Sequence, residues 1–274
     1  MTMTQSEKAV RFRTLHDGPG AFVIPNPWDA GSARMLAGLG FQALATSSGA
    51  SALSIGKRDG MLSREEALSH SRTIVEATNL PVSADLEKGF GDAPEVVAET
   101  VRLAAEAGLV GCTIEDSTGD PANPLFEFNL AVDRIAAAAQ AARALPFPFA
   151  LTARAHNFLC PNPDLQQTIR RLQAYEAAGA DVLFAPGLPD LESVRTVCKA
   201  VTKPFNFMVG FKGKSFSVSD LAAAGVRRIS LAASLYRAAM TGLLEAAREV
   251  KESGQFGYLD RVLTTPELTD RMRF

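Results

Sequence analysis

Three acidic residues in this chain have the spacing to bind a metal ion. Asp85 and Glu87 end one buried apolar run, and Glu115 ends the next. Because side chains alternate along a strand, Asp85 and Glu87 point to one side, where Glu115 can join them from the neighbouring strand. Crowded carboxylates repel each other unless a cation or proton lies among them, and Mg²⁺ prefers all-oxygen ligands. The pattern predicts a site for Mg²⁺, or for Mn²⁺; the alternative is that these acids cap helices or pair with Lys88 or Arg154.

Three further polar features follow apolar runs. Arg154 needs an anionic partner, for which a substrate carboxylate is one candidate and Glu115 or Glu87 the other. His156 can act as general acid or base near neutral pH, or only as a hydrogen-bond donor to another group. The small-residue turn of residues 46–51 has backbone N–H groups that could bind a carboxylate or phosphate, although such turns are common without a ligand.

The elements that must position these residues alternate strictly. Residues 64–78, 94–107, 131–144 and 165–178 carry apolar side chains at three- and four-residue spacing, as helices that cover a sheet do. The alternation predicts an α/β fold with a parallel sheet buried on both faces, and eight units favour a closed (β/α)₈ TIM barrel over an open doubly wound sheet. The expected strands are residues 22–26, 43–48, 82–87, 111–116, 149–154, 182–187, 205–210 and 228–233.

Glycine and proline separate the units in alternation. A glycine precedes each even-numbered strand, where a left-handed helix cap costs glycine little, and proline precedes the third, fifth and seventh strands. No low-complexity linker interrupts the units, so we expect one domain, with the barrel over residues 20–253 and an extension over residues 254–274. The separating residues are Gly40, Gly108, Gly179 and Gly225, and Pro81, Pro146, Pro148 and Pro204.

Composition limits the function classes. Hydrophobic residues make up 47% of the 274 residues, and the formal net charge is -2 with both signs interspersed, which argues against a nucleic-acid or membrane partner. No segment has the roughly 18 apolar residues of a membrane span, and the first 15 residues lack the apolar core of a signal peptide. The cysteines lack C-x-x-C spacing and are odd in number, which argues against both a disulfide framework and a zinc site; they are Cys112, Cys160 and Cys198. We expect a cytoplasmic protein whose partners are small molecules and copies of itself.

Several motifs together resemble the isocitrate lyase/phosphoenolpyruvate mutase superfamily. Residues 85–91, Asp-Leu-Glu-Lys-Gly-Phe-Gly, are similar to the superfamily signature D-x-[DE]-x-G-[YF]-G, and residues 26–34 are similar to its first βα unit. The resemblance extends to about residue 252. Its other short motifs are Ser48-Gly49-Ala50, Asp59, Ile114-Glu115-Asp116 and Ala153-Arg154.

The resemblance implies a role for each matching residue. Asp85 would be the direct Mg²⁺ ligand, and the water shell of the metal would be held by Asp59, Glu87 and Glu115. The substrate carboxylate and 2-oxo group would bind Ser48, Gly49 and Ala50, and Arg154 would neutralise the carboxylate. Superfamily members form or consume an enolate of a small 2-oxo acid, so Arg154, Glu115 and His156 are the catalytic candidates, His156 on its chemistry alone.

Two departures from the superfamily pattern narrow the chemistry. Isocitrate and methylisocitrate lyases carry a K-[KR]-C-G-H loop after the Glu-Asp pair, whereas residues 117–125 contain no cysteine. Cys112 lies within a strand and is expected to pack as a small hydrophobe. Phosphonomutases usually have lysine after Glu-Asp, where this chain has Ser117, and Asn123 only loosely echoes their Lys-Thr-Asn-Ser loop.

These features favour a Mg²⁺-dependent lyase that breaks a C–C bond next to a 2-oxo carboxylate, with oxaloacetate-like decarboxylation first because it needs no cysteine loop. A phosphonopyruvate or carboxyphosphonoenolpyruvate mutase or hydrolase is the alternative, and the absence of a cation between Glu115 and Glu127 disfavours it. A non-catalytic barrel that binds a 2-oxo acid is the third hypothesis.

The segment of residues 234–250 fits an eighth barrel helix with an apolar stripe. The superfamily resemblance implies that this helix is exchanged between two subunits and that two such dimers pair into a tetramer; the alternative is a helix packed on its own barrel. We expect a homo-oligomer, at least a dimer. The stripe comprises Leu235, Ala238, Ala239, Leu243, Ala246 and Ala247.

Overall fold

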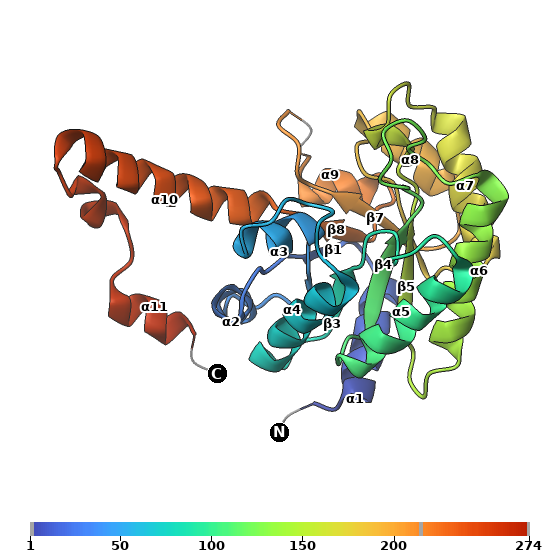
Figure 1. Ribbon diagram of the computed structural model, residues 1–274, viewed down its shortest axis with the longest axis horizontal. Coiled ribbons are helices and arrows are strands. Elements are labelled where there is room, and N and C mark those ends of the chain that lie inside the picture. Colours follow the sequence, from blue (N-terminus) through green and yellow to red (C-terminus); the bar gives the residue numbers. More distant parts are fainter. Residues whose placement is uncertain (1–2, 214–215, 273–274) are drawn as a thin grey trace.

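Eight parallel strands form a nearly closed barrel, as the alternating pattern predicts (Figure 1). The computed structural model describes residues 3–213 and 216–272. The strand order is β1-β8-β7-β6-β5-β4-β3-β2, and the backbone N–H of Ala45, at the end of β2, donates to the carbonyl of Pro25, directly after β1, over 3.1 Å. The strands are β1 (Phe22–Ile24), β2 (Leu44–Ala45), β3 (Val82–Asp85), β4 (Gly111–Glu115), β5 (Ala150–Arg154), β6 (Val182–Phe184), β7 (Phe205–Met208) and β8 (Arg228–Ser230).

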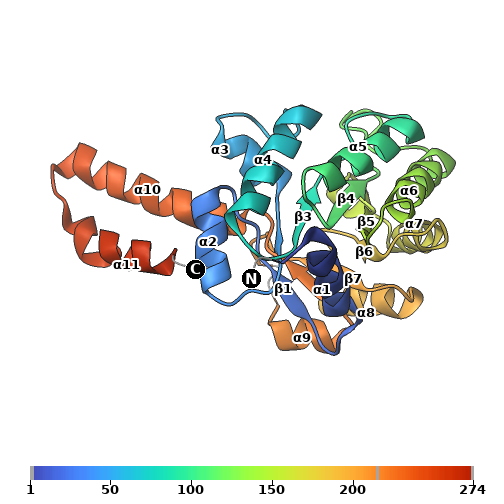
Figure 2. The ribbon, with the colours of Figure 1, turned by 90° about the horizontal axis from the view of Figure 1, so that it is seen from below.

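Helices surround the barrel and occupy the four segments expected from their apolar spacing (Figure 2). They are α1 (Gln5–Asp17), α2 (Ala30–Gly38), α3 (Ser48–Ser54), α4 (Arg64–Ala77), α5 (Pro94–Glu106), α6 (Phe128–Arg143), η1 (Asn157–Leu159), α7 (Leu165–Ala177), α8 (Leu191–Ala200) and α9 (Val218–Ala223). The chain continues in an arm that projects from the barrel and comprises α10 (Ser234–Ser253), η2 (Gly257–Arg261) and α11 (Thr265–Arg271) (Figure 1). Within the described residues, no helix combines the length and apolar character that crossing a membrane requires.

The glycines between units adopt the predicted left-handed conformation. Gly40, Gly108, Gly179 and Gly225 have φ of 88°, 89°, 105° and 100°. A side chain at Gly108 would place its Cβ 2.8 Å from a methyl carbon of Val75, so space as well as conformation requires glycine there. The strands themselves are shorter than the apolar runs: seven of them end before the predicted run does, whereas β5 begins one residue late and ends at Arg154 as predicted.

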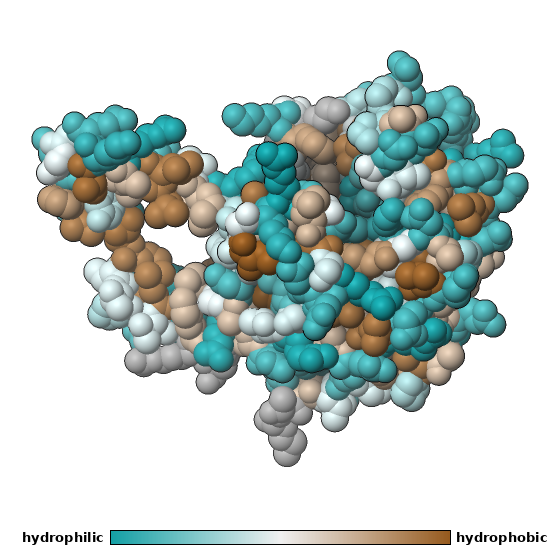
Figure 3. Space-filling view, in the orientation of Figure 1, coloured by the Kyte–Doolittle hydropathy of each residue, from teal (hydrophilic) through white to brown (hydrophobic). Residues whose placement is uncertain are grey.

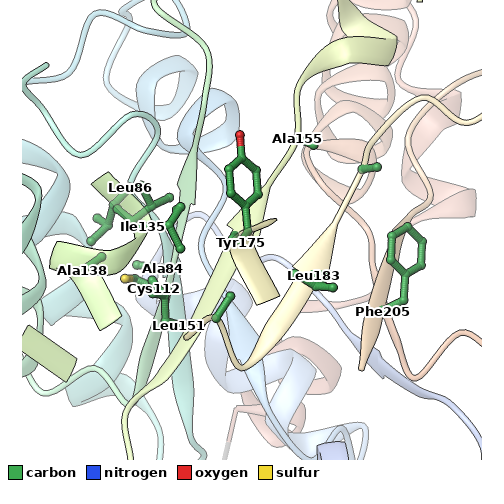
Figure 4. Close-up of a cluster of buried hydrophobic side chains, with 14 of the residues drawn as sticks. Ala84, Leu86, Cys112, Ile135, Ala138, Leu151, Ala155, Tyr175, Leu183 and Phe205 are labelled. Carbon is green, nitrogen blue, oxygen red and sulfur yellow. The ribbon is translucent and has the colours of Figure 1, made fainter. Parts of the chain in front are cut away.

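The core between the sheet and the helices contains the outward-facing side chains of the strands. Cys112 is one of them, fully buried with Ala84 and Leu151 (Figure 4). Burial raises the pKa of its thiol, so the prediction that Cys112 packs as a hydrophobe is confirmed. All three cysteines are free.

The barrel has a floor, which is made by α1. Phe12 is fully buried there against Ile24 and Val110, at the end opposite to the site. His16, in the last turn of α1, is also buried, and its ring contacts Phe12 and Phe22 edge-on. The amino-terminal helix therefore closes the barrel from below.

Candidate active site at the barrel mouth

The acids and Arg154 meet where three adjacent strands end. Asp85, Glu115 and Arg154 are the last residues of β3, β4 and β5, and Glu115 is paired with Arg154 in the sheet register. One guanidinium nitrogen of Arg154, Nη1, lies 3.0 Å from Glu115 Oε2 and 4.0 Å from Asp85 Oδ2. The structure thus brings together the residues expected at the mouth, with Arg154 between two carboxylates.

The Ser48-Gly49-Ala50 segment is the first turn of α3 rather than an open turn. The expected strand of residues 43–48 ends at Ala45, because the Ser47 hydroxyl caps the helix by accepting from the N–H of Ala50 over 3.4 Å. Ser48 directs both its hydroxyl, over 3.2 Å, and its N–H, over 3.4 Å, to Asp85 Oδ2. The segment lies beside Asp85, and its role in substrate binding stays a prediction.

Asp59 lies at the exposed rim of the site, next to Gly49. A Cβ atom at Gly49 would stand 3.1 Å from Asp59 Oδ2, so glycine permits this close approach. The negative charge of Asp59 contributes to raising the pKa of both Asp85 and Glu87. The fourth predicted acid therefore belongs to the same electrostatic cluster.

The backbone at Glu87 is strained. Glu87 and Phe90 have φ of 51° and 61°, in the left-handed region that non-glycine residues rarely adopt, and Gly89 between them has φ of 84°. Such strain persists only where the surroundings impose it, and it occurs frequently at functional sites. The strand ends at Asp85 instead of continuing to Glu87 as the sequence predicted, yet the Glu87 carboxyl still lies among the acids, since the charges of Asp85, Asp59 and Glu115 raise its pKa.

Arg134 of α6 holds this strained turn from behind, a role that the sequence did not reveal. Its side chain is 1% exposed and donates to the carbonyls of Lys88, of Gly91 over 2.7 Å and of Asp92 over 2.5 Å. Its guanidinium also stacks on the Phe126 ring, 4.1 Å from the ring centroid. Three carbonyls that face no other donor in the described structure are thereby satisfied by one buried cation.

The clustered acids perturb one another. Burial, and then the negative charges of Asp85, Asp59 and Glu115, raise the pKa of Glu87 to about 8. Burial also raises the pKa of Asp85, although Arg154 opposes this. Burial works in the same direction on Glu115, but Arg154 and His156 outweigh it and keep the pKa of Glu115 below its usual value. In this arrangement the Glu87 carboxyl is therefore protonated at pH 7, because its burial and the neighbouring carboxylates disfavour its negative charge.

His156 stands beside Glu115 and is fixed through its backbone. The imidazole Nδ1 lies 3.6 Å from Glu115 Oε2, beyond normal hydrogen-bond length, and has no other partner among the described residues. The His156 N–H donates to Asp116 Oδ1, and Asp116 Oδ2 accepts from the Tyr175 hydroxyl and from Arg171 of α7. The sequence predicted His156 at the mouth but not Arg171 and Tyr175. The apolar spacing of a helix does not show which of its polar side chains reach the end of a strand.

The donor set fits a hard divalent cation. Asp59, Asp85, Glu87 and Glu115 offer oxygen ligands only, and the mutual repulsion that raises the Glu87 pKa is what a bound cation would relieve. As the side chains stand, no three Asp, Glu, His or Cys groups within residues 3–213 and 216–272 are close enough to hold a metal. Arg154 engages two of the carboxylates, so metal binding would require these side chains to regroup.

The loop after β4 closes on itself. Ser117 and Leu125 form an antiparallel bridge, and Lys88 donates to the carbonyl of Thr118 over 2.9 Å and to Asp92. The loop itself contains no basic residue, but the ammonium group of Lys88, from the neighbouring turn at Glu87, contacts it. Sequence analysis considered Lys88 only as a partner for the acids.

An eight-stranded parallel barrel with acids, an arginine and a histidine at its carboxyl-terminal mouth is the architecture of a (β/α)₈ enzyme. Residues 12–251 match the family model described as phosphoenolpyruvate phosphomutase. The chain belongs to this family, within the isocitrate lyase/phosphoenolpyruvate mutase superfamily of lyases and mutases.

Known relatives cover nearly the whole chain. A 2-methylisocitrate lyase of Shewanella oneidensis is 31% identical over 277 residues, 97% of this chain and 93% of that protein. An oxaloacetate decarboxylase of Pseudomonas savastanoi pv. phaseolicola is 29% identical over 248 residues, 88% of this chain and 84% of its own. A crystal structure from Burkholderia cenocepacia J2315, described only by class as a lyase/mutase, superposes with a TM-score of 0.95 at 51% identity, covering 97% of this chain and 95% of that one.

Proposed function

We propose that this protein is a Mg²⁺-dependent lyase that cleaves a C–C bond adjacent to a 2-oxo carboxylate, with oxaloacetate decarboxylation as the favoured reaction. The observation that carries the proposal is the cluster of Asp59, Asp85, Glu87 and Glu115 facing Arg154 at the mouth. Named relatives include both an oxaloacetate decarboxylase and a 2-methylisocitrate lyase at similar identity. The missing cysteine in residues 117–125 favours the former chemistry.

Asp85 would hold the metal directly, and Asp59, Glu87 and Glu115 would hold its water shell. When bound, Mg²⁺ or Mn²⁺ would stabilise the negative charge that develops on the 2-oxo and carboxylate oxygens. Every other task falls to the protein's own side chains.

Arg154 would bind the substrate carboxylate. Its guanidinium is shared between Glu115 and Asp85, so an incoming carboxylate would compete for, or share, the same guanidinium. The Ser48-Gly49-Ala50 segment beside Asp85 would receive the carboxylate and 2-oxo group from the opposite side. Together these groups would orient the bond that breaks.

His156 would supply the proton that completes the reaction. Loss of CO₂ from carbon 4 of oxaloacetate leaves the electron pair of the broken bond as the enolate of pyruvate, and protonation at carbon 3 gives pyruvate. The His156 ring has a free Nδ1 at the mouth, and Asp116 fixes its backbone. Glu115 Oε2 lies 3.6 Å from that nitrogen, so the imidazole and the carboxylate face the same space at the mouth.

The phosphonate alternative has one supporting observation. Lys88 lies against the loop after β4, where a phosphoryl group would need a cation. The geometry nevertheless engages Lys88 with Asp92 and a carbonyl, so its charge is already partly compensated.

The deciding experiment is a panel of 2-oxo acids and phosphonates incubated with Mg²⁺, with pyruvate release as the readout. We expect release from oxaloacetate above the enzyme-free rate, loss of that release with a chelator, and a large loss in Arg154→Met. Turnover of phosphonopyruvate instead would establish the alternative, and no product from any compound would support a barrel that binds 2-oxo acids without catalysis.

A further inference from the structure

The inside of the barrel directly below the site is polar. Interiors of such barrels are normally filled by branched apolar side chains. Here Thr113, Thr152 and Asn206 point inward from β4, β5 and β7, and Arg228, the first residue of β8, joins them. A charged residue in this layer calls for a partner or a function.

Arg228 has no such partner in the described part of the chain. Its side chain is buried, with the residue 3% exposed; Nε donates to Asn206 Oδ1 over 2.8 Å and Nη2 to Thr152 Oγ1 over 3.1 Å. Nη1 is enclosed without any hydrogen-bond partner, and no carboxylate of the described residues forms an ion pair with the guanidinium. Both groups that it contacts are neutral.

The charge on Arg228 persists at neutral pH. Burial lowers its pKa to about 9, which still leaves the guanidinium protonated at pH 7. His16, on the floor, adds no charge of its own: burial and the nearby positive charge of Arg228 lower its pKa to about 3, so the ring is neutral at pH 7. An unpaired buried charge is strongly unfavourable, and an anion that arrives from the mouth would relieve it.

A cavity connects Arg228 with the site. Its volume is about 50 Å³, and its lining extends from Arg228 and Asn206 to Asp85 and Arg154. Thr152 and Arg154 are two residues apart on the same face of β5, about 7 Å along the strand, so the Arg228 guanidinium lies one layer below that of Arg154. The space accommodates a group the size of one carboxylate.

We propose that Arg228 binds the second carboxylate of a dicarboxylic 2-oxo acid, the one remote from the 2-oxo group, which points down the barrel axis into this cavity. The inference rests on the proposed function for the placement of the first carboxylate. It makes Arg228 the residue that selects dicarboxylic over monocarboxylic substrates. Asn206 and Thr152 hold the guanidinium in position.

The test compares two ligands that differ only in the proposed contact. Oxaloacetate and 2-oxobutyrate have the same four-carbon length, with a methyl group in place of the second carboxylate, and 3,3-difluorooxaloacetate serves as a slowly reacting form of the former. Calorimetric titration in the presence of Mg²⁺ should show tighter binding of the dicarboxylate by wild type, by about 10- to 100-fold, as for a hydrogen bond to a charged group. Arg228→Met should abolish this preference and leave the affinity for 2-oxobutyrate unchanged.

Arg227 provides the matched control. It is the neighbouring residue, but its guanidinium donates to the carbonyls of Gly18 and Gly20 outside the cavity. Arg227→Met should keep the wild-type preference for the dicarboxylate. Because Arg228→Met could fail to fold, Arg228→Gln, which retains polar donors toward Asn206 and Thr152, is titrated in parallel, and the thermal unfolding of every variant is recorded.

Each outcome separates the two proposals. Equal affinity of wild type for the two ligands, an undiminished preference in folded Arg228 variants, or the same loss in Arg227→Met would overturn the assignment of Arg228. If the preference depends on Arg228 but no 2-oxo acid is cleaved, the assignment stands and the proposed reaction is wrong. If wild type binds neither ligand, both proposals are overturned.

Discussion

The carboxylate of Asp116 joins the end of β4 to His156, whose backbone N–H donates to Asp116 Oδ1 over 2.7 Å. The other oxygen, Oδ2, accepts from the Tyr175 hydroxyl over 2.5 Å and from Arg171 Nη1 over 3.1 Å. All of these groups are buried or nearly so. A helix on the outside of the barrel therefore determines where the candidate proton donor stands.

Asp116→Asn should uncouple this arrangement. The amide of asparagine offers only one oxygen acceptor, and its NH₂ group faces N–H and O–H donors that need an acceptor. Arg171 also loses its counterion, and together these changes should lower the free energy of unfolding by about 3–5 kcal/mol. A displaced His156 should lower kcat on the order of 100-fold. Tyr175→Phe removes a single donor and should cost about 1 kcal/mol, with kcat within a few-fold of wild type. Urea unfolding and steady-state kinetics measure both; a wild-type kcat in Asp116→Asn would contradict the positioning role.

Asp85→Ala should abolish metal-dependent binding of oxalate, an enolate mimic, while the barrel stays folded. The side chain faces the mouth, where it would contribute an oxygen ligand to the metal, and it provides no apolar packing. Asp92→Ala is the control, because Asp92 pairs with Lys88 at the surface and lies outside the acid cluster. Calorimetry with and without Mg²⁺ decides the point, and unchanged Mg²⁺-dependent affinity in Asp85→Ala would remove this residue from the site.

Arg134→Met should loosen the strained turn that carries Glu87. Three backbone carbonyls lose their donor, for which we expect a loss of about 3 kcal/mol in the free energy of unfolding and faster amide exchange over residues 88–92. Arg102→Met, which removes an exposed guanidinium paired with Glu99, should cost less than about 1 kcal/mol. Exchange rates equal to wild type over residues 88–92 would show that the turn keeps its shape without Arg134.

Periodicity and turn chemistry predicted the barrel and the strand ends because both are local properties. Gly108 needs a left-handed conformation wherever it occurs, and a buried strand requires an apolar run of about the observed length. The α1 helix was not predicted, since its apolar residues do not form a periodic stripe; a Thr4–Glu7 capping box marks its start. That box was the signal available in the sequence.

Long-range partners could not be predicted in the same way. Asp85, Glu115, Arg154 and His156 were found because all of them stand at strand ends, which the fold class alone brings together. Arg134 reaches its carbonyls across more than 40 residues of sequence, and Arg228 crosses the barrel to Thr152. The spacing of residues along the sequence does not indicate contacts over such separations. The available signal was an arginine at the start of the eighth predicted strand. That it points into the barrel follows only once the barrel is known to be closed.

His16 should make the stability of the protein fall below neutral pH. Its folded pKa is about 3, because burial and the charges of Arg228 and Arg227 oppose protonation, against about 6.5 when unfolded. A lowered histidine pKa contributes stability that is complete above pH 6.5 and is lost as the pH falls toward 3, by about 2 kcal/mol at pH 5. His16→Leu should remove this contribution. Urea unfolding of wild type and of His16→Leu from pH 7.5 to pH 5 isolates this contribution, since the two proteins share all other titratable groups. If the free energy of unfolding depends on pH in the same way in both proteins, His16 does not cause the effect.

The α10 helix packs on its own barrel through its first turn, where Leu235 contacts the core and the Tyr236 ring meets Trp28 edge-on, and the rest of the helix projects away. None of its residues is buried, and it projects from the barrel before η2 and α11 turn back toward α2 (Figures 1 and 2). Apolar side chains remain open to solvent along this arm, and Figure 3 shows brown patches on it. Leu243, Leu244 and Phe256 are 60%, 55% and 58% exposed. The alternative of an eighth helix covering its own sheet is therefore wrong for this structure, whereas exchange between subunits stays a prediction.

We expect the arm to be covered by a second copy of the chain, because exposed leucines on a long helix with no covering element are unfavourable in a monomer. Full-length protein should run as a dimer or tetramer at micromolar concentration, and truncation before Ser234 should cause aggregation. Replacing Leu243 and Leu244 by aspartate should weaken the assembly, whereas Glu245→Gln on the same helix should not. Light scattering behind a sizing column measures the mass of each, and a full-length monomer would exclude the exchanged helix.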